Sequence, residues 1–324
     1  MTANQTKSLI RKDLDHVDEE LRPALDHFPE FKLNLEGLSV LRAFPPSDPL
    51  RDPPYKETII HHPERGDGLR MLIIDPGTTG KPRPALLYLH GGGFVFGSPE
   101  QILPTMQKLA ADVGCVICLP AYRLAPENTF PAPLEDNYLA LSWMFENAKA
   151  LGIDTDRIAV GGDSAGGGHA ANLAIAARDR QFYPISFQLL LYPMLDDRTG
   201  SSRPVPDKVG EFIWTVESNK FGWSSYLGCP AGGPNVPSQA VPARRQDLTK
   251  LPPTLIATGS LDLFCEENSR FADRLDQNGV DVDLQIFSGA YHGFNVMVPE
   301  AKISKRFHQC CVEGLKEGLK AKQN

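Results

Sequence analysis

A serine flanked by glycines is the first place in the sequence where chemistry is expected. Residues 158–177 read IAVGGDSAGGGHAANLAIAA, in which Gly162, Ser164 and Gly166 fit the pattern G-x-S-x-G. An apolar, strand-like run precedes the pattern, and an alanine-rich, helix-like run follows it. A serine on such a sharp turn has a strained backbone, and a Cβ two positions before or after it would collide with the neighbouring chain. The pattern therefore predicts a projecting, nucleophilic hydroxyl at Ser164.

Other uses of a glycine-rich turn fit this segment less well. A Walker-type phosphate loop would continue with Gly-Lys-Ser or Gly-Lys-Thr, and a dinucleotide site would show G-x-G-x-x-G; neither is present here. A plain tight turn remains an alternative for the motif taken by itself. A nucleophilic serine also needs amide donors for an oxyanion, a base and an orienting acid, which must come from other parts of the chain.

A second glycine run supplies candidate donors. His90-Gly91-Gly92-Gly93 follows the apolar stretch LLYL, upstream of the serine. Consecutive glycines let the backbone approach a substrate and present its N–H groups, and the residue after a nucleophilic serine contributes another. We expect Gly91, Gly92, Gly93 and Ala165 to form an oxyanion hole.

The base is expected among the three histidines that follow Ser164. His169 lies five residues into the helix-like run, where a packing or surface role is expected. His308 lies in a late helical pattern with basic neighbours, which is typical of a solvated face. His292 lies in FSGAYHGFNV, just after the strand-like run DVDLQIF, and it is the predicted base.

The orienting acid is expected between the serine and His292. The segment PTLIATGSLDLFCEEN offers Asp262 three residues after Gly259. Glu266 and Glu267 open the helical pattern that follows, where acidic side chains favour the helix dipole without any catalytic role. Asp262 is therefore the predicted acid.

Strand-like and helix-like patterns alternate through the body of the chain. Expected strands cover residues 69–76, 83–90, 115–120, 157–162, 185–193, 253–259 and 281–287, and expected helices cover 101–113, 134–152, the run after Ser164, 266–279 and 301–322. This alternation predicts an α/β fold with a mostly parallel sheet and helices on both faces. Functional sites of such sheets lie beyond the carboxyl ends of the strands.

Composition narrows the function further. The 324-residue chain is 41% hydrophobic and has a net charge of -7, which argues against nucleic acid as a partner. No apolar run approaches the roughly 20 residues that span a bilayer. The N-terminal segment is too charged for a signal peptide, so a cytoplasmic location is expected. Cys115 and Cys118 lie in a strand-like run and are expected to be buried free thiols, and no metal site is indicated.

Three further segments have distinct patterns. Apolar residues at helical spacing predict an N-terminal amphipathic helix with Leu14, Val17, Leu21, Leu25 and Phe28 on one face. Residues 43–57 are rich in proline and are interpreted as a tie to the first strands. Residues 196–250 are rich in glycine, proline and aromatic residues, which together with the N-terminal part favours a lid over the functional edge of the sheet.

Together these segments resemble the hormone-sensitive-lipase-like family of α/β-hydrolases. The resemblance rests on HGGGF, YRLAPENTFPAPLED from Tyr122, GGDSAGG around Ser164, GSLDLF and YHGF, in that order. It implies an eight-stranded sheet of α/β-hydrolase type, oxyanion amides chiefly from Gly92 and Gly93, and carboxylesterase activity that often prefers short or medium acyl chains. The acid loop reads D-L-F-C-E from Asp262, where many relatives have D-P-L-R-D.

The resemblance also implies a division of the chain. Residues 1–50 and 195–250 would form a helical cap, and residues 51–194 with 251–324 the catalytic domain. The expected partner is a small ester substrate, with no nucleic acid, no membrane span, no cofactor and no metal. Many members of the family are dimers, which makes a homodimer a candidate assembly.

An apolar substrate pocket of modest size is expected near the glycine run. Phe94 and Phe96 follow the glycines, and Trp214 lies in the aromatic-rich segment of the predicted lid. Aromatic residues at such spacing are as often the core of the lid itself. Hydrolysis of an amide or lactone, or acyl transfer, would use the same catalytic residues, and a receptor that binds a small ligand without hydrolysis is the alternative from another class.

Overall fold

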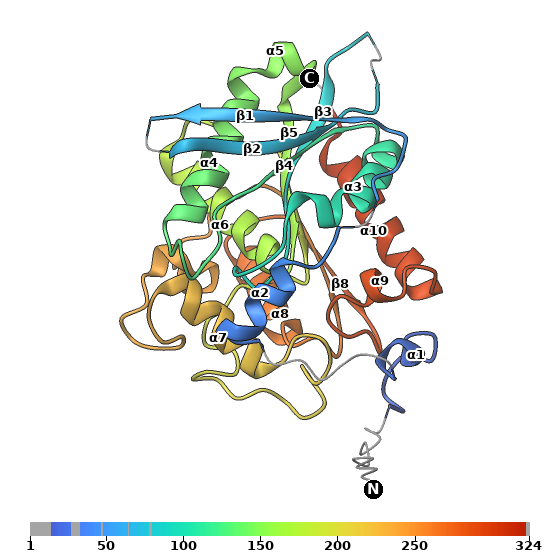
Figure 1. Ribbon diagram of the computed structural model, residues 1–324, viewed down its shortest axis with the longest axis vertical. Helices are drawn as coiled ribbons and strands as arrows, with labels where there is room; N and C mark the ends of the chain where they lie inside the picture. Colours follow the sequence, from blue (N-terminus) through green and yellow to red (C-terminus); the bar gives the residue numbers. More distant parts are fainter. Residues whose placement is uncertain (1–13, 27–32, 47, 64, 78–79, 322–324) are drawn as a thin grey trace, which may run out of the picture.

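The computed structural model describes residues 14–26, 33–46, 48–63, 65–77 and 80–321 (Figure 1). Its centre is an eight-stranded sheet with the order β1-β2-β4-β3-β5-β6-β7-β8. The strands are β1 (Tyr55–His62), β2 (Arg65–Ile74), β3 (Arg83–Leu89), β4 (Val116–Pro120), β5 (Ile153–Asp163), β6 (Phe187–Leu191), β7 (Thr254–Gly259) and β8 (Val282–Phe287). From β4 to β8 all neighbours are parallel, whereas β2 pairs antiparallel with β1 and β4. The predicted α/β class is confirmed.

The register of the sheet brings the loops that carry the expected functional residues to the same edge of the sheet. β3 lies between β4 and β5, so the chain order reverses at β3, and ligand sites of open α/β sheets lie at such a point. Leu89, the last residue of β3, is opposite Gly162 of β5. Gly259 at the end of β7 is opposite Phe287 at the end of β8. The glycine run therefore leaves the sheet beside the serine turn, and the acid loop leaves it beside the histidine loop.

Helices cover both faces of the sheet, and apolar side chains fill the space between. One hydrophobic cluster joins α4, α6 and α8 to the sheet, and a second joins α3 and α10 to the other face. The helices are α3 (Pro99–Val113), α4 (Ala132–Glu146), α5 (Ala148–Leu151), α6 (Ala165–Arg180), α8 (Cys265–Gln277), α9 (Phe294–Met297) and α10 (Lys302–Gly318). The single helix predicted over 134–152 is interrupted at Asn147, whose side-chain amide donates to the carbonyl of Trp143 (2.9 Å).

The long N-terminal helix expected from the apolar spacing is not formed by the described residues. Residues 14–21 form turns and a bend, and α1 (Arg22–Leu25) is a four-residue helix with a proline in its first turn. Val17 and Leu21 are nevertheless buried against the α3–α10 face, so the apolar spacing marked contact with the body but not the helix. Phe28 lies outside the described residues.

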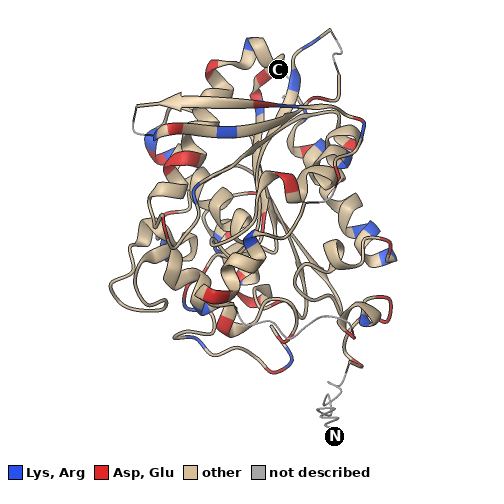
Figure 2. Ribbon diagram, in the orientation of Figure 1, with Lys and Arg blue, Asp and Glu red and all other residues tan. Residues whose placement is uncertain are grey.

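The first strand was missed because it carries almost no apolar pattern. β1 begins in the last three residues of the proline-rich segment and continues to His62, and seven of its eight side chains are exposed or half-buried. It pairs with β2 along most of its length. Acidic and basic residues are interspersed over this hairpin and over the outer helices (Figure 2).

Two segments distant in sequence pack together over the carboxyl edge of the sheet. They contain α2 (Leu35–Arg42) from the N-terminal part, and α7 (Val216–Leu227) with the short 3-10 helices Ser238–Ala240 and Pro242–Arg244 from the insertion between β6 and β7. Figure 1 shows α2 beside α7. Leu38 of α2 and Trp223 of α7 belong to one hydrophobic cluster. The Arg42 guanidinium donates to the carbonyl of Val95 (2.8 Å), which ties α2 to the glycine run.

Candidate active site

Ser164 occupies the strained turn that the glycine spacing predicted. Its φ is 55° and its ψ is -121°, and it is the N-cap of α6. A Cβ on Gly162 would lie 2.4 Å from the backbone carbon of Gly166, and a Cβ on Gly166 would lie 2.0 Å from the carbonyl oxygen of Leu89. Backbone atoms therefore enclose both glycines, and the turn can form only without side chains there.

The predicted base and acid meet this serine in series. His292 Nε2 lies 3.0 Å from Ser164 Oγ, and His292 Nδ1 lies 2.8 Å from Asp262 Oδ2. All three side chains are buried. With Nδ1 protonated, the imidazole donates to the carboxylate and its Nε2 is free to accept the serine proton. Three loops separated by up to 128 residues thus form one continuous hydrogen-bonded chain.

The acid is fixed by its own loop. Asp262 has no exposed surface, and its Oδ1 accepts the backbone N–H of Phe264 (2.9 Å). The other oxygen is left for the histidine. Ser260 Oγ accepts the N–H of Gly289 (2.9 Å), so the acid loop and the histidine loop are also tied to each other.

The glycine run after β3 brings backbone amides to the same edge. Gly92 and Gly93 have φ values of 117° and 57°, in the region that favours glycine. A Cβ on Gly92 would lie 2.0 Å from the carbonyl oxygen of Phe96. Ala165 is the first residue of α6, and N–H groups in the first turn of a helix have no intrahelical acceptor.

Gly91 differs from the other two glycines. A Cβ on this residue would lie 2.4 Å from Asp163 Oδ2, so its backbone packs directly against the Asp163 carboxylate. Gly91 therefore brings the start of the glycine run into contact with the serine turn. That its amide donates to an oxyanion stays a prediction.

Asp163 was quoted in the motif but given no role, and it is a second carboxylate at the site. Burial raises its pKa to about 6, against hydrogen bonds that lower it. One of these comes from Tyr88, whose hydroxyl donates to Asp163 Oδ1 (3.1 Å). The sequence could have indicated a structural role for Asp163, because a carboxyl group beside a buried serine turn needs hydrogen-bond donors.

His90 supports the glycine run from below. Its ring stacks on Tyr122 with a centroid distance of 4.2 Å, and burial lowers its pKa to about 4. The Tyr122 hydroxyl donates to the carbonyl oxygen of His90 (2.6 Å). A neutral, packed imidazole therefore fixes the position of the first residue of the glycine run.

The two histidines set aside from the sequence have other surroundings. His169 is buried among the rings of Phe94, Tyr122 and Tyr226, and burial lowers its pKa to about 3. Its packing role agrees with the expectation. His308 is half-buried on α10, where its Nε2 lies 2.7 Å from an Asp112 carboxylate oxygen.

Glu267 has a structural role that the helix-dipole interpretation missed. Its side chain is buried at the start of α8, and Oε1 accepts the N–H groups of Leu195 (2.6 Å) and Asp196 (3.1 Å). Oε2 accepts the hydroxyl of Thr199. Burial and the nearby Asp196 carboxylate raise the Glu267 pKa well above its ordinary value. Glu267 thus anchors the start of the insertion to the helix that follows the acid.

The three aromatic residues expected at a substrate pocket lie in different places. Phe94 is buried in a stack with Tyr226, at a centroid distance of 4.4 Å, so its ring is enclosed by protein. Phe96 is partly buried at the edge of the same cluster. Trp214 lies against the glycine run, because a Cβ on Gly93 would be 2.0 Å from its ring.

The expected free thiols are confirmed. Cys115 and Cys118 are buried and unpaired, and burial raises the pKa of each thiol to about 12. Among the described residues, no group of three or more His, Cys, Asp and Glu side chains could hold a metal ion. Within the same part of the chain, no helix is long and apolar enough to cross a bilayer.

Comparison with known proteins places this geometry in a family. Residues 86–296 match the family described as having the alpha/beta hydrolase fold. Carboxylesterase NlhH of Mycobacterium tuberculosis is 33% identical over 313 residues, which cover 91% of this chain and 93% of that protein. Esterase LipI of the same organism is 36% identical over 222 residues, covering 67% and 68%. The solved structure of a bacterial heroin esterase aligns with a TM-score of 0.85 and 34% identity, over 94% of this chain and 99% of that one.

The sheet order, the serine turn and the histidine–aspartate contact together have the form of an α/β-hydrolase. The chain belongs to the hormone-sensitive-lipase-like family of α/β-hydrolases, and its activity is that of a carboxylic ester hydrolase. The resemblance inferred from its motifs is therefore confirmed.

Proposed function

We propose that the chain hydrolyses short- to medium-chain carboxylic esters through an acyl-enzyme on Ser164. The observation that carries the proposal is the 3.0 Å contact between Ser164 Oγ and His292 Nε2, continued at 2.8 Å to Asp262. Neutral His292 accepts the serine proton as Oγ attacks the ester carbonyl. Asp262 holds the imidazole in the required tautomer and stabilises the imidazolium.

The second half of the reaction uses the same groups in reverse. His292 donates its proton to the leaving alcohol, and the acyl group remains on Ser164. Water then enters, His292 accepts one of its protons, and the hydroxide attacks the acyl-enzyme. Proton transfer back to Ser164 releases the carboxylic acid and restores the starting state. Every step is carried by side chains and amides of this chain.

Amides of the serine turn and the glycine run would hold the negative oxygen. We assign this role chiefly to Gly92, Gly93 and Ala165, with Gly91 as a further candidate donor in the same run. The positive φ of Gly92 and Gly93 supports the assignment, since it gives this segment a backbone conformation that residues with side chains rarely adopt. Removing one such donor typically costs about 100- to 1000-fold in rate.

The limit on substrate size is assigned to Trp214 and Phe96. Trp214 lies on Gly93, and its ring centroid is 6.3 Å from that of His292, so a bulky ester group must displace it. Ser164 is only 5% exposed. A relative of 33% identity, covering 68% of each chain, carries the name ethyl acetate hydrolase in Pseudomonas putida. These points favour small esters for this chain.

Nitrophenyl esters from acetate to palmitate test the size limit. We expect kcat/KM to be highest for short or medium acyl chains and to fall steeply for the longest. Replacing Trp214 with leucine should extend the range toward longer chains. An optimum at palmitate in the wild-type protein would contradict a small closed pocket.

A fluorophosphonate probe separates the enzyme from a receptor that merely binds a ligand. Covalent labelling of the wild-type protein that is lost in Ser164→Ala supports the nucleophile, whereas no labelling of either supports a receptor. Amide, lactone and acyl-transfer substrates assayed beside the esters identify the bond that is cleaved fastest.

Three broader expectations remain part of the proposal. We retain residues 1–50 and 195–250 as a cap over a catalytic domain of 51–194 and 251–324, because α2 and α7 share a hydrophobic cluster. Six free cysteines are typical of a reducing compartment and support a cytoplasmic enzyme. A homodimer is the assembly we would test first, by light scattering.

A further inference from the structure

Tyr192 has an unusual backbone conformation beside the proposed base. It directly follows β6 and has a φ of 35°, in the left-handed region that a bulky side chain rarely adopts. Its N–H donates to the carbonyl of Ala257 on β7 (2.6 Å), and the residue is only 2% exposed. Strained residues of this kind persist where the surrounding structure fixes them, and they are concentrated at functional sites. The proposed reaction uses no group of Tyr192, so the strain needs another reason.

The ring of Tyr192 packs against the imidazole of His292. The two ring centroids are 4.9 Å apart, and the angle between the ring planes is 68°. The Tyr192 ring is itself stacked on Phe307 of α10, at a centroid distance of 5.7 Å and an angle of 17°. Near-perpendicular and offset-stacked ring contacts at such distances are favourable beyond the area that they bury. Tyr192 therefore connects the imidazole to α10.

The hydroxyl of Tyr192 contacts the same segment three residues further on. It donates to Asn295 Oδ1 (3.0 Å), and Asn295 belongs to α9. Burial raises the pKa of Tyr192 well above its ordinary value, so the hydroxyl remains protonated and continues to donate. One side chain thus contacts both the imidazole of His292 and the helix that begins two residues after it.

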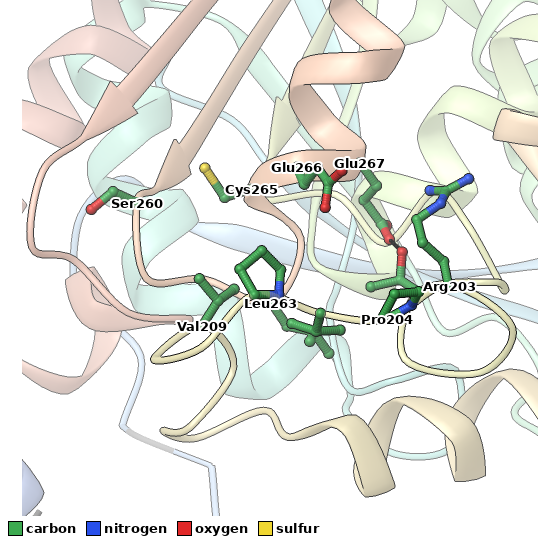
Figure 3. Close-up of a pocket in the computed structure, with 11 residues that line it drawn as sticks. Arg203, Pro204, Val209, Ser260, Leu263, Cys265, Glu266 and Glu267 are labelled. Atoms are coloured by element: carbon green, nitrogen blue, oxygen red, sulfur yellow. Dashed lines mark hydrogen bonds between the residues drawn. The ribbon is translucent and has the colours of Figure 1, made fainter.

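The backbone on the two sides of His292 is held in different ways. On the N-terminal side, Ser260 Oγ accepts the N–H of Gly289 (2.9 Å). Figure 3 shows Ser260 where β7 ends, at a cavity of about 160 Å³ that leaves the packing incomplete on this side of the acid loop. On the C-terminal side, Gly293 has a φ of 70°, and apart from its chain neighbours no described residue has an atom within 4 Å of a Cβ placed there. Packing does not fix this glycine, so the hydrogen bond to Asn295 restrains the backbone on this side.

We propose that Tyr192 is a positioning residue for the base, and that its ring and hydroxyl together hold the His292 imidazole in place for Ser164. The inference rests on the proposed function, in which His292 accepts the serine proton and passes it on. The imidazole must stay within reach of the serine before and after it is protonated, and a displacement of about 1 Å can lower the rate by about 100-fold. Phe264 also meets the imidazole nearly at right angles, at a centroid distance of 5.2 Å, but it has no hydroxyl that could bind α9.

Removal of the hydroxyl alone tests the inference. In Tyr192→Phe the ring contact stays and the bond to Asn295 is lost, so we expect kcat for 4-nitrophenyl butyrate to fall by about tenfold, close to what the loss of one hydrogen bond costs. KM should not change, because the hydroxyl binds no part of the substrate. Asn295→Ala removes the acceptor and should give the same loss, and the double variant should lose no more than either single variant. Tyr183→Phe removes a hydroxyl bonded to Glu146 (3.2 Å) beyond the far end of α6, and as the control it should keep wild-type kcat and KM.

Proton NMR reports on the imidazole independently of turnover. The Nδ1 proton of His292, which is shared with Asp262, should give a low-field signal in the wild-type protein that is missing in His292→Ala. In Tyr192→Phe and Asn295→Ala we expect this proton to exchange with solvent about tenfold faster, because the imidazole leaves the carboxylate more often. A tyrosine that serves only the stability of the fold would lower the melting temperature and leave both this exchange and kcat unchanged.

The outcomes separate this inference from the proposed function. Wild-type turnover in His292→Ala would remove the base and with it the proposed function. An inactive His292→Ala protein beside a Tyr192→Phe protein with wild-type kcat and wild-type proton exchange would overturn the positioning role alone. A raised KM at unchanged kcat would also overturn it, because Tyr192 would then serve substrate binding. Should Tyr192→Phe not fold, Asn295→Ala, at a half-buried position of α9, decides by the same measurements.

Discussion

The serine turn and the glycine run both use glycine to bring backbone to the edge of the sheet, but Gly93 of the run is enclosed by a side chain, whereas Gly162 and Gly166 of the turn are enclosed by backbone. Around Ser164, a Cβ on Gly162 or Gly166 would meet backbone atoms, at 2.4 Å and 2.0 Å. In the run, a Cβ on Gly93 would meet the ring of Trp214, a side chain of the insertion. The first constraint belongs to the backbone of the turn and the adjoining strand end, whereas the second is imposed by the insertion between β6 and β7.

Because the atoms around their glycines differ, the serine turn and the glycine run should differ in how well they tolerate substitution. At Gly162 and Gly166 the nearest atoms are backbone atoms, which cannot move aside as a side chain can, so these two glycines are required for the fold. The glycine run has a movable neighbour at Gly93, so its shape and the space above it depend on Trp214. We therefore expect the nucleophile to tolerate no change nearby, and the substrate range to be set from the insertion.

Gly166→Ala tests the rigid side of the comparison and should have the largest effect. The new methyl group would lie 2.0 Å from the carbonyl oxygen of Leu89, so the turn cannot close. We expect esterase activity below detection and unfolding at lower temperature, by several kcal/mol in stability, on the order of the most severe single substitutions. Gly66→Ala, where no atom lies within 4 Å, is the matched control in circular dichroism melts and activity assays.

Gly93→Ala tests the movable side. The methyl group collides with Trp214 and displaces a proposed oxyanion donor, so kcat should fall by about 100- to 1000-fold with a smaller change in stability. Adding Trp214→Leu should recover part of the loss, whereas Gly166→Ala should not respond to it. Wild-type activity in Gly93→Ala would show that this amide is not used.

His169→Leu tests the packing beneath both turns. Native His169 has a pKa lowered to about 3, from an ordinary value of 6.5, so the unfolded chain takes up a proton first as the pH falls. The wild-type protein should therefore lose stability between about pH 6.5 and pH 3, on the order of a few kcal/mol, and the variant should lose less. Urea unfolding at several pH values measures the difference. Identical pH profiles would show that the ring is not held neutral.

Asp163→Asn tests the contact between the serine turn and the glycine run. Here the native protein should lose stability as the pH rises, opposite to the case of His169, and the expected loss is smaller. The pKa of Asp163 is raised from 3.8 to about 6, so the native state resists ionisation that the unfolded state undergoes. Its contribution to stability is complete below about pH 4 and declines as the pH rises to about 6, and the asparagine variant lacks this decline. The comparison of unfolding free energies at pH 4 and pH 7 measures it. A difference that does not change with pH would contradict a buried, protonatable carboxyl.

The sequence predicted the edge that carries Ser164, Asp262 and His292 more fully than the insertion between β6 and β7. Ser164, Asp262 and His292 follow strands with clear apolar patterns, and parallel strands bring their carboxyl ends to one edge, so their meeting could be inferred. The family resemblance then implied an eight-stranded sheet, one strand more than the apolar patterns had indicated. β1 was not predicted because its side chains are mostly exposed and show no alternation of buried and exposed positions.

Side-chain partners outside regular elements could not be predicted from spacing. Gly91 was grouped with its neighbours, because only the structure shows that it packs against Asp163. Glu267 looked like a helix-dipole residue, yet it is buried under the insertion. The sequence could not distinguish the roles of Phe94, Phe96 and Trp214. The structure places Phe94 in the hydrophobic core, Phe96 at its edge and Trp214 over the glycine run, because of how the insertion between β6 and β7 folds.

Turnover of 4-nitrophenyl butyrate by wild type and Ser164→Ala tests the central claim most directly. If the hydroxyl at 3.0 Å from His292 is the nucleophile, its removal should lower kcat by about a million-fold in a protein that still melts like wild type. A folded Ser164→Ala protein that retains a substantial fraction of the activity would contradict the account.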